Sequence, residues 1–313
     1  MTFEELDNAR LAYKKRMVKL IQIFIAIFAI IAIFVIAMAI GSNDDFSALM
    51  ILPMLLQPAF FLLIIAIIVI VFATHKQALA YKKTYKAYFV AATLAKIFTD
   101  LKYSHDLGYP KAAIAATGMM RMGDRYHSND FVSGRYKNIA FSQADVHIED
   151  EYTDSDGDTH YVTIFKGRFL TFEFNRDFSF KLQVAHKNFG NNCLPRGKEI
   201  RKFEKIEVES PNFNKKFNIY GQDGFEAFYL LDPAFLEKIE QLGDNCGGRI
   251  MLMFMDNKLH IALYDGKDSL EPPSPFKEID EQAELQKVSS DIKIITDFID
   301  KLTLDKYAFK KTS

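Results

Sequence analysis

The sequence predicts an α+β protein with an N-terminal two-helix transmembrane hairpin, a long helical stalk and a cytoplasmic domain built on a mainly antiparallel sheet with flanking helices. Two long apolar runs, 20–40 and 48–73, lie close together near the start of the chain. After them, segments rich in β-branched and aromatic residues alternate with segments of helical periodicity, a pattern typical of α+β domains.

Each apolar run is long enough to cross a bilayer, for which a helix needs about 20 apolar residues. The first run contains one polar side chain, Gln22, and the second is interrupted only by Gln57 and two prolines. Neither run contains Lys, Arg, Asp or Glu. We therefore expect a short basic segment over 1–17 and a transmembrane hairpin over 18–74.

The flanks of the two runs are basic, whereas the loop between them, 41–47, has no Lys or Arg and carries two Asp. Cytoplasmic flanks of membrane spans are enriched in Lys and Arg, so both termini are expected in the cytoplasm. The basic residues after the second run are also candidates for contact with the membrane surface, since cations near an anionic leaflet are attracted to it. The alternative is a solvated collar that only fixes orientation. The residues concerned are Arg10, Lys14, Lys15, Arg16 and Lys19 before the first run, and Lys76, Lys82, Lys83 and Lys86 after the second.

Residues 75–107 contain no Gly or Pro and place Tyr81, Tyr85 and Tyr88 at helical spacing. This predicts one helix that ends at Gly108. A polar loop follows at 124–130, and we group stalk and loop as 75–130. The remaining residues, 131–313, are expected to form the cytoplasmic domain.

Strands of an antiparallel meander are predicted wherever short runs are rich in β-branched and aromatic residues. A hairpin is predicted where two such runs flank the turn sequence Asp256-Asn257-Lys258. The meander strands are 144–151, 159–165, 169–175, 179–186, 205–210 and 216–220, and the hairpin strands are 249–255 and 259–264.

Two helices are predicted in the same domain. Asp232 can cap the first, Pro233 fits its first turn, and an apolar stripe ends at Gly243. The second, 277–302, has an apolar seam with alternating spacings of three and four. That seam suits packing on the protein's own sheet, which we favour, and also a coiled coil that would make a homo-oligomer.

Residues Asp124, Arg125, Tyr126 and His127 are the candidate ligand-binding site, because an Arg guanidinium can pair with a phosphate or carboxylate. The alternative is a structural ion pair between Asp124 and Arg125. We expect no catalytic residues, metal or cofactor. The histidines are scattered, and Cys193 and Cys246 stand in no metal or redox spacing. The acidic stretch 154–158 has its Gly at position four of a calcium loop and not at six, and Phe165 stands at position twelve, where Glu is required. No basic face with interleaved aromatics indicates nucleic-acid binding.

Several segments in order and spacing resemble one protein family: 85–90, 124–126, 165–167, 209–213, 227–233 and 257–262. The most specific are Glu209-Ser210-Pro211-Asn212-Phe213 and Ala227-Phe228-Tyr229-Leu230-Leu231-Asp232-Pro233. Over 75–302 the chain resembles an uncharacterised bacterial two-pass membrane-protein family, domain of unknown function thirty-one thirty-seven. Phe228 departs from that family, whose members commonly carry Arg there.

The resemblance implies a multi-pass protein of the bacterial cytoplasmic (inner) membrane, with a LemA-type or other membrane protein as partner. It implies no activity, because the family has none established. We expect a non-enzymatic membrane-anchored interaction or scaffold protein. The alternative is a membrane-tethered enzyme or ligand-binding protein that acts on a phosphate- or carboxylate-bearing small molecule through 124–127. A third candidate is lipid sensing by the basic collar.

Overall fold

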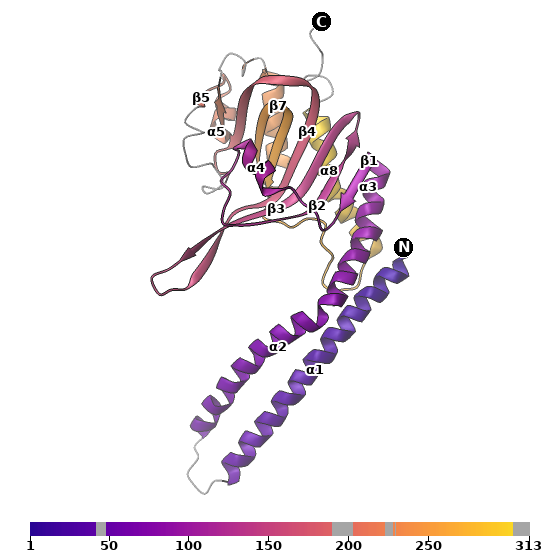
Figure 1. Ribbon diagram of the computed structural model, residues 1–313, viewed down its shortest axis with the longest axis vertical. Coiled ribbons are helices and arrows are strands. Elements are labelled where there is room, and N and C mark those ends of the chain that lie inside the picture. Colours follow the sequence, from indigo (N-terminus) through magenta and orange to yellow (C-terminus); the bar gives the residue numbers. More distant parts are fainter. Residues whose placement is uncertain (42–47, 190–202, 223–227, 229, 303–313) are drawn as a thin grey trace. The chain divides into compact units, whose positions relative to one another are not determined.

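The computed structural model describes residues 1–41, 48–189, 203–222, 228 and 230–302 (Figure 1). Its helices and large antiparallel sheet confirm the predicted α+β class. The chain divides into two compact units. We call them the helical unit, Met1–Phe89 with Pro272–Glu281, and the sheet unit, Val90–Glu271 with Gln282–Ser313.

The helical unit contains α1 (Phe3–Gly41) and α2 (Ala48–Tyr85). Thr2 and Glu5 form a reciprocal cap at the start of α1: the Thr2 hydroxyl accepts from the Glu5 amide at 3.2 Å, and the Thr2 amide donates to the Glu5 carboxylate at 2.8 Å. Among the residues that the structure describes, two helices are long and apolar enough to cross a membrane, within Phe3–Ala37 and Ala59–Ile97. The protein buries 0% and 11% of their most apolar windows, which distinguishes them from core helices of a soluble domain.

The helical unit also holds Pro272–Glu281 against α1 and α2. Arg10 is 4% exposed; its Nε lies 2.7 Å from Asp7, and its Nη1 donates to the carbonyls of Pro275 and Lys277 at 3.1 and 3.2 Å. The Tyr81 hydroxyl donates to the Pro273 carbonyl at 3.1 Å. The Arg10 guanidinium therefore pairs with groups of the protein itself, whereas the sequence alone suggested only that Arg10 helps to orient the chain in the membrane.

The predicted helix over 75–107 is wrong at its C-terminal end. After α2 the chain forms a π-helical turn, η1 (Lys86–Ala91), and a short α3 (Ala92–Ile97), and then becomes strand β1 (Thr99–Ser104). β1 pairs antiparallel with β2, for example Tyr103 with Val132. Pairing with a distant strand overrides the local helical pattern, which carries no signal of that partner.

In the part of the chain that the structure describes, seven strands form the sheet in the order β1-β2-β3-β4-β6-β5, and β7 pairs with β4 outside this path. All of the pairings are antiparallel. β4 pairs with β3 along its first half and with β6 at its end, while β7 lies along its other edge. The remaining strands are β2 (Arg125–Tyr136), β3 (Ile139–Thr153), β4 (Thr159–His186), β5 (Glu204–Ile206), β6 (Phe217–Gly221) and β7 (Arg249–Tyr264).

The three strands predicted over 159–186 are one strand, β4. Gly167, in the gap between two of the predicted strands, lies inside it, and a Cβ at this position would lie 2.0 Å from the carbonyl oxygen of Leu263 on β7. The glycine therefore permits a close approach of two backbones and does not mark a turn. The predicted hairpin at 256–258 is also wrong, because Asp256 (φ 52°) lies within the continuous β7, next to irregularities in its pairing with β4.

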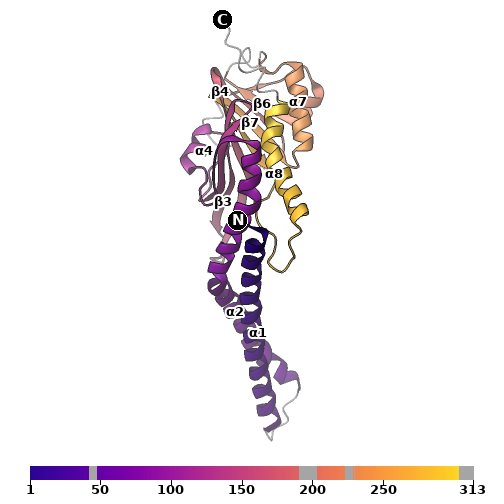
Figure 2. The same cartoon turned by 90° about the vertical axis from the view of Figure 1, so that its right-hand side faces the viewer.

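Helices cover both faces of the sheet. Figures 1 and 2 show α4 (Lys111–Thr117) on one face and α7 (Pro233–Asn245) and α8 (Glu281–Lys301) on the other. Beneath α4, Ile114 packs with Val146, Phe165 and Phe169. The seam of α8 is buried within the single chain, as predicted for packing on its own domain, although the helix starts four residues later than 277. Its buried residues are Val288, Ile292, Ile295, Phe298 and Ile299.

Candidate functional site

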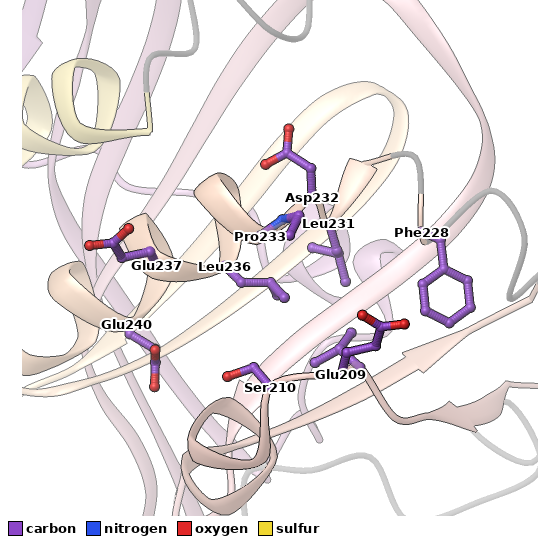
Figure 3. Close-up of a pocket in the computed structure, with 10 residues that line it drawn as sticks. Glu209, Ser210, Phe228, Leu231, Asp232, Pro233, Leu236, Glu237 and Glu240 are labelled. Carbon is purple, nitrogen blue, oxygen red and sulfur yellow. The ribbon is translucent and has the colours of Figure 1, made fainter.

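A cleft of about 540 Å³ opens in the sheet unit between the segment that leads into α5 (Pro211–Lys216) and the first turns of α7 (Figure 3). One wall comes from the residues before α5, and the other comes from α7 and the residues just before it. The lining residues are Val208, Glu209, Ser210, Phe228, Leu231, Asp232, Pro233, Leu236, Glu237 and Glu240.

In each wall a helix begins with the same local motif, an N-cap residue followed by proline. The Ser210 hydroxyl accepts from the Phe213 amide at 3.3 Å, and the Asp232 carboxylate accepts from the Phe235 amide at 2.7 Å. Such caps satisfy a backbone donor that the helix leaves free. The predicted cap at Asp232 is thus confirmed. α7 ends at Asn245, two residues beyond the predicted stop at Gly243.

The floor of the cleft is apolar and its rim is acidic. Leu231 and Leu236 are buried, while Phe228 is 52% exposed. Figure 3 shows Phe228 at one end of the cleft and Glu237 and Glu240 toward the other. No Lys or Arg occurs among the lining residues. Four carboxylates belong to the lining, and none of them forms an ion pair with a described residue: Glu209, Asp232, Glu237 and Glu240.

The lining supports binding better than bond-breaking chemistry. The Ser210 hydroxyl is engaged as a cap, and no His, Cys or Lys among the described lining residues can activate it. Apolar surface combined with several fixed charges is the chemistry of a recognition site. The cleft can therefore hold an apolar side chain with positive charge beside it.

Three of the predicted ligand-binding residues, Arg125, Tyr126 and His127, begin strand β2, and Asp124 lies immediately before it. The Asp124 carboxylate accepts from the backbone amide of Glu151 at 3.0 Å. Arg125 lies 3.9 Å from the Glu149 carboxylate and 4.4 Å from the ring centre of Tyr161, so the predicted alternative, an Asp124–Arg125 ion pair, does not form.

The other two members of that group point elsewhere. The Tyr126 hydroxyl donates to the Tyr109 carbonyl at 2.5 Å, whereas His127 lines a small cavity of about 60 Å³ beside Asp145. Alternate residues of a strand face opposite sides of the sheet. The described pockets accordingly do not enclose the four side chains together.

The basic residues predicted to touch the membrane surface differ in exposure. Lys76 and Lys83 are exposed and Lys82 is partly exposed, but Lys86 is buried. The structure therefore does not offer the Lys86 ammonium group for lipid contact.

A group of three carboxylates has the spacing of metal ligands. One oxygen from each of Asp130, Asp268 and Glu271 lies within 4.8 Å of the others. Protein donors already reach this group: Asn129 donates to Asp130 at 2.8 Å and Tyr103 donates to Asp130 at 2.7 Å. These carboxylates thus form part of a hydrogen-bonded network, and their spacing alone does not assign a metal.

Asp145 is the most unusual titratable group beside this network. Its Oδ2 accepts from the Ser269 amide at 2.7 Å, while its buried Oδ1 has no hydrogen-bond partner among the described residues. Burial, together with the negative charges of Asp130 and Asp268, raises the pKa of Asp145 well above that of an ordinary carboxyl group. On β7, burial lowers the pKa of His260 to about 4.

Glu237 and Glu240 are cleft residues that sequence reasoning missed. One signal was present: residues 217–237 contain no Lys or Arg and carry Asp223, Glu226, Asp232 and Glu237. Single acidic residues on a helix are ordinary, however, and only the folded chain shows that these face the stretch around Ser210.

Fold and cleft together define an α+β domain with an apolar, acid-rimmed cleft, preceded by two helices long and apolar enough to span a membrane. The model of a family described as "Protein of unknown function (DUF3137)" matches residues 163–304, which include both walls of the cleft. The predicted resemblance is confirmed over this range, which begins later than the expected residue 75.

Comparison with curated proteins gives no match. Among solved structures, the crystal structure of the mycobacterial trehalose monomycolate transport factor A, TtfA, is similar with a TM-score of 0.38 and 9% identity. The similarity covers 73% of this chain and 96% of that one.

Proposed function

We propose that this is a membrane-anchored interaction protein whose sheet unit binds a segment of a partner protein in the cleft. The observation that carries the proposal is the composition of the two walls. Glu209-Ser210 and Leu231-Asp232-Pro233 belong to the two stretches on which the family resemblance most depends, and they meet across one apolar floor.

The two apolar helices supply the anchor in this proposal. We place them in the bacterial inner membrane as a two-pass hairpin with both termini in the cytoplasm, because Lys and Arg flank the spans and are missing from the loop between them. The sheet unit then lies in the cytoplasm near the inner leaflet. Partners in reach include other membrane proteins, of which a LemA-type protein is one candidate.

The enzyme alternative gains no support from the geometry. It required Asp124, Arg125, Tyr126 and His127 to converge, and these side chains bind separate neighbours. Binding without chemistry is therefore the function that the described residues favour.

Site-specific photocrosslinking tests the proposal in cells. A benzophenone amino acid replaces Phe228, which is exposed in the cleft, and in a matched control it replaces Tyr161, which is similarly exposed on the β3–β4 hairpin. We expect a discrete crosslinked protein from position 228 that is missing from position 161. No crosslinked protein at 228, or the same products from both positions, would contradict a binding role for the cleft.

A further inference from the structure

We infer that the partner segment bound by the cleft is positively charged and inserts one large apolar side chain, as the cytoplasmic flank of a membrane protein does. The inference rests on the proposed function and specifies its ligand. It follows from three properties of the cleft: the acidic charge of its described lining residues, its apolar floor and its position in the proposed topology.

The charge of the lining has one sign. Glu209 lies on one wall, and Asp232, Glu237 and Glu240 lie on the other. Lys216, at the end of α5, does not line the cleft. It is paired with Asp244 at 2.8 Å and interacts more weakly with Glu240. A Lys or Arg side chain that enters this space interacts with several carboxylates within one Debye length, about 8 to 10 Å in physiological salt.

The floor selects an apolar anchor between those charges. Phe228 is a large aromatic side chain that remains 52% exposed, with Leu231 and Leu236 buried behind it. A volume of about 540 Å³ accommodates a bulky side chain and the backbone on either side of it. Aromatic anchors in such pockets commonly dominate binding energy.

Charge also decides between protein and lipid as the occupant. Anionic headgroups would meet four carboxylates and be repelled, so the cleft is unsuited to the bilayer surface itself. Segments rich in Lys and Arg beside apolar residues are characteristic of the cytoplasmic ends of membrane spans. A domain held at the same leaflet meets such segments at high local concentration.

The test uses the full chain in detergent micelles and a fluorescein-labelled synthetic peptide in which Lys and Ser residues surround a single Phe. We expect fluorescence anisotropy to report binding that weakens as NaCl is added. The double variant E237Q/E240Q should bind about fivefold more weakly and F228A about tenfold more weakly. A peptide with Glu in place of Lys should not bind.

A matched control removes two carboxylates from the same unit outside the cleft: E151Q/D156N on the β3–β4 hairpin should bind like the parent chain. If E237Q/E240Q unfolds at a lower temperature than the parent, E209K on the opposite wall replaces it, since Glu209 is exposed before α5. The lysine there should abolish peptide binding.

Two results would overturn the inference. One is equal affinity of the cleft variants and the control variant for the Lys peptide. The other is a crosslinked partner at position 228 whose contacting segment is neutral or acidic, which would leave the proposed binding function standing. If position 228 forms no crosslink at all, the proposed binding function and this inference are both refuted.

Discussion

Asp145 shows how one buried residue can set the pH response of the sheet unit. The folded state raises its pKa through burial and the neighbouring carboxylates of Asp130 and Asp268. Between the ordinary carboxyl pKa and this raised value, the folded protein holds a proton that the unfolded chain releases. The folded state therefore loses stability as pH rises through this window.

We predict that D145N stabilises the protein at neutral pH and has little effect in acid, where the native carboxyl is already protonated. An increase of about 2–4 °C in melting temperature, for roughly 1 kcal/mol, is the expected scale for a unit of this size. Thermal unfolding of parent and variant at a series of pH values measures the difference. A variant that is destabilised only as the pH rises toward neutral would show instead that the ionised carboxylate stabilises the fold.

Single residues also show what a sequence can and cannot predict. The cap at Asp232 was predictable because capping depends on the next three residues of the chain. The pairing of Arg125 with Glu149 was not, because the two meet only when β2 and β3 align. The continuity of β4 through Gly167 was not predictable for the same reason: the β7 backbone that approaches this glycine comes from nearly a hundred residues later in the chain.

At the scale of elements, the start of α1 clamps the segment between β7 and α8. The Arg10 guanidinium contacts Asp7 and two carbonyls of that segment, those of Pro275 and Lys277. Hydrogen bonds to a charged donor typically contribute more than neutral ones, about 1.5–3 kcal/mol. The helix is thus a structural partner of residues distant in the chain.

We predict that R10A loosens the segment Pro272–Glu281 and accelerates tryptic cleavage after Lys277 about tenfold or more, because local opening governs protease access. Mass spectrometry of the early fragments measures this rate. R16A, which removes an exposed arginine of the same helix, serves as the control and should leave cleavage unchanged. Equal rates in R10A and the parent would refute the clamp.

Elements with a strong local period were predicted well, and those defined by distant pairing were not. α7 and α8 follow from their apolar stripes. β1 was predicted as helix, and the turn residues in β7 were predicted as a hairpin, because each is fixed by a neighbouring strand. The cleft also depends on contacts between distant segments. Both of its walls were recognisable in the sequence, but the sequence did not show that they lie opposite each other.

At the scale of the whole molecule, the proposed topology makes a direct prediction. In a chain whose Cys193 and Cys246 are replaced by serine, D44C lies between the two apolar runs, whereas D156C lies on the β3–β4 hairpin. We expect a membrane-impermeant maleimide to label D44C in spheroplasts and to label D156C only after the membrane is opened. The reverse pattern would place the sheet unit outside the cell.

The length of β4 has a practical consequence for dissecting this protein. The family match begins at residue 163, four residues inside a strand that starts at Thr159, and it omits β1, β2 and β3 altogether. A fragment that begins there would lack β3, so the N-terminal half of β4 would have an unpaired edge. Exposed strand edges of this kind promote aggregation. Recombinant work on the sheet unit should instead begin near Val90, where that unit starts.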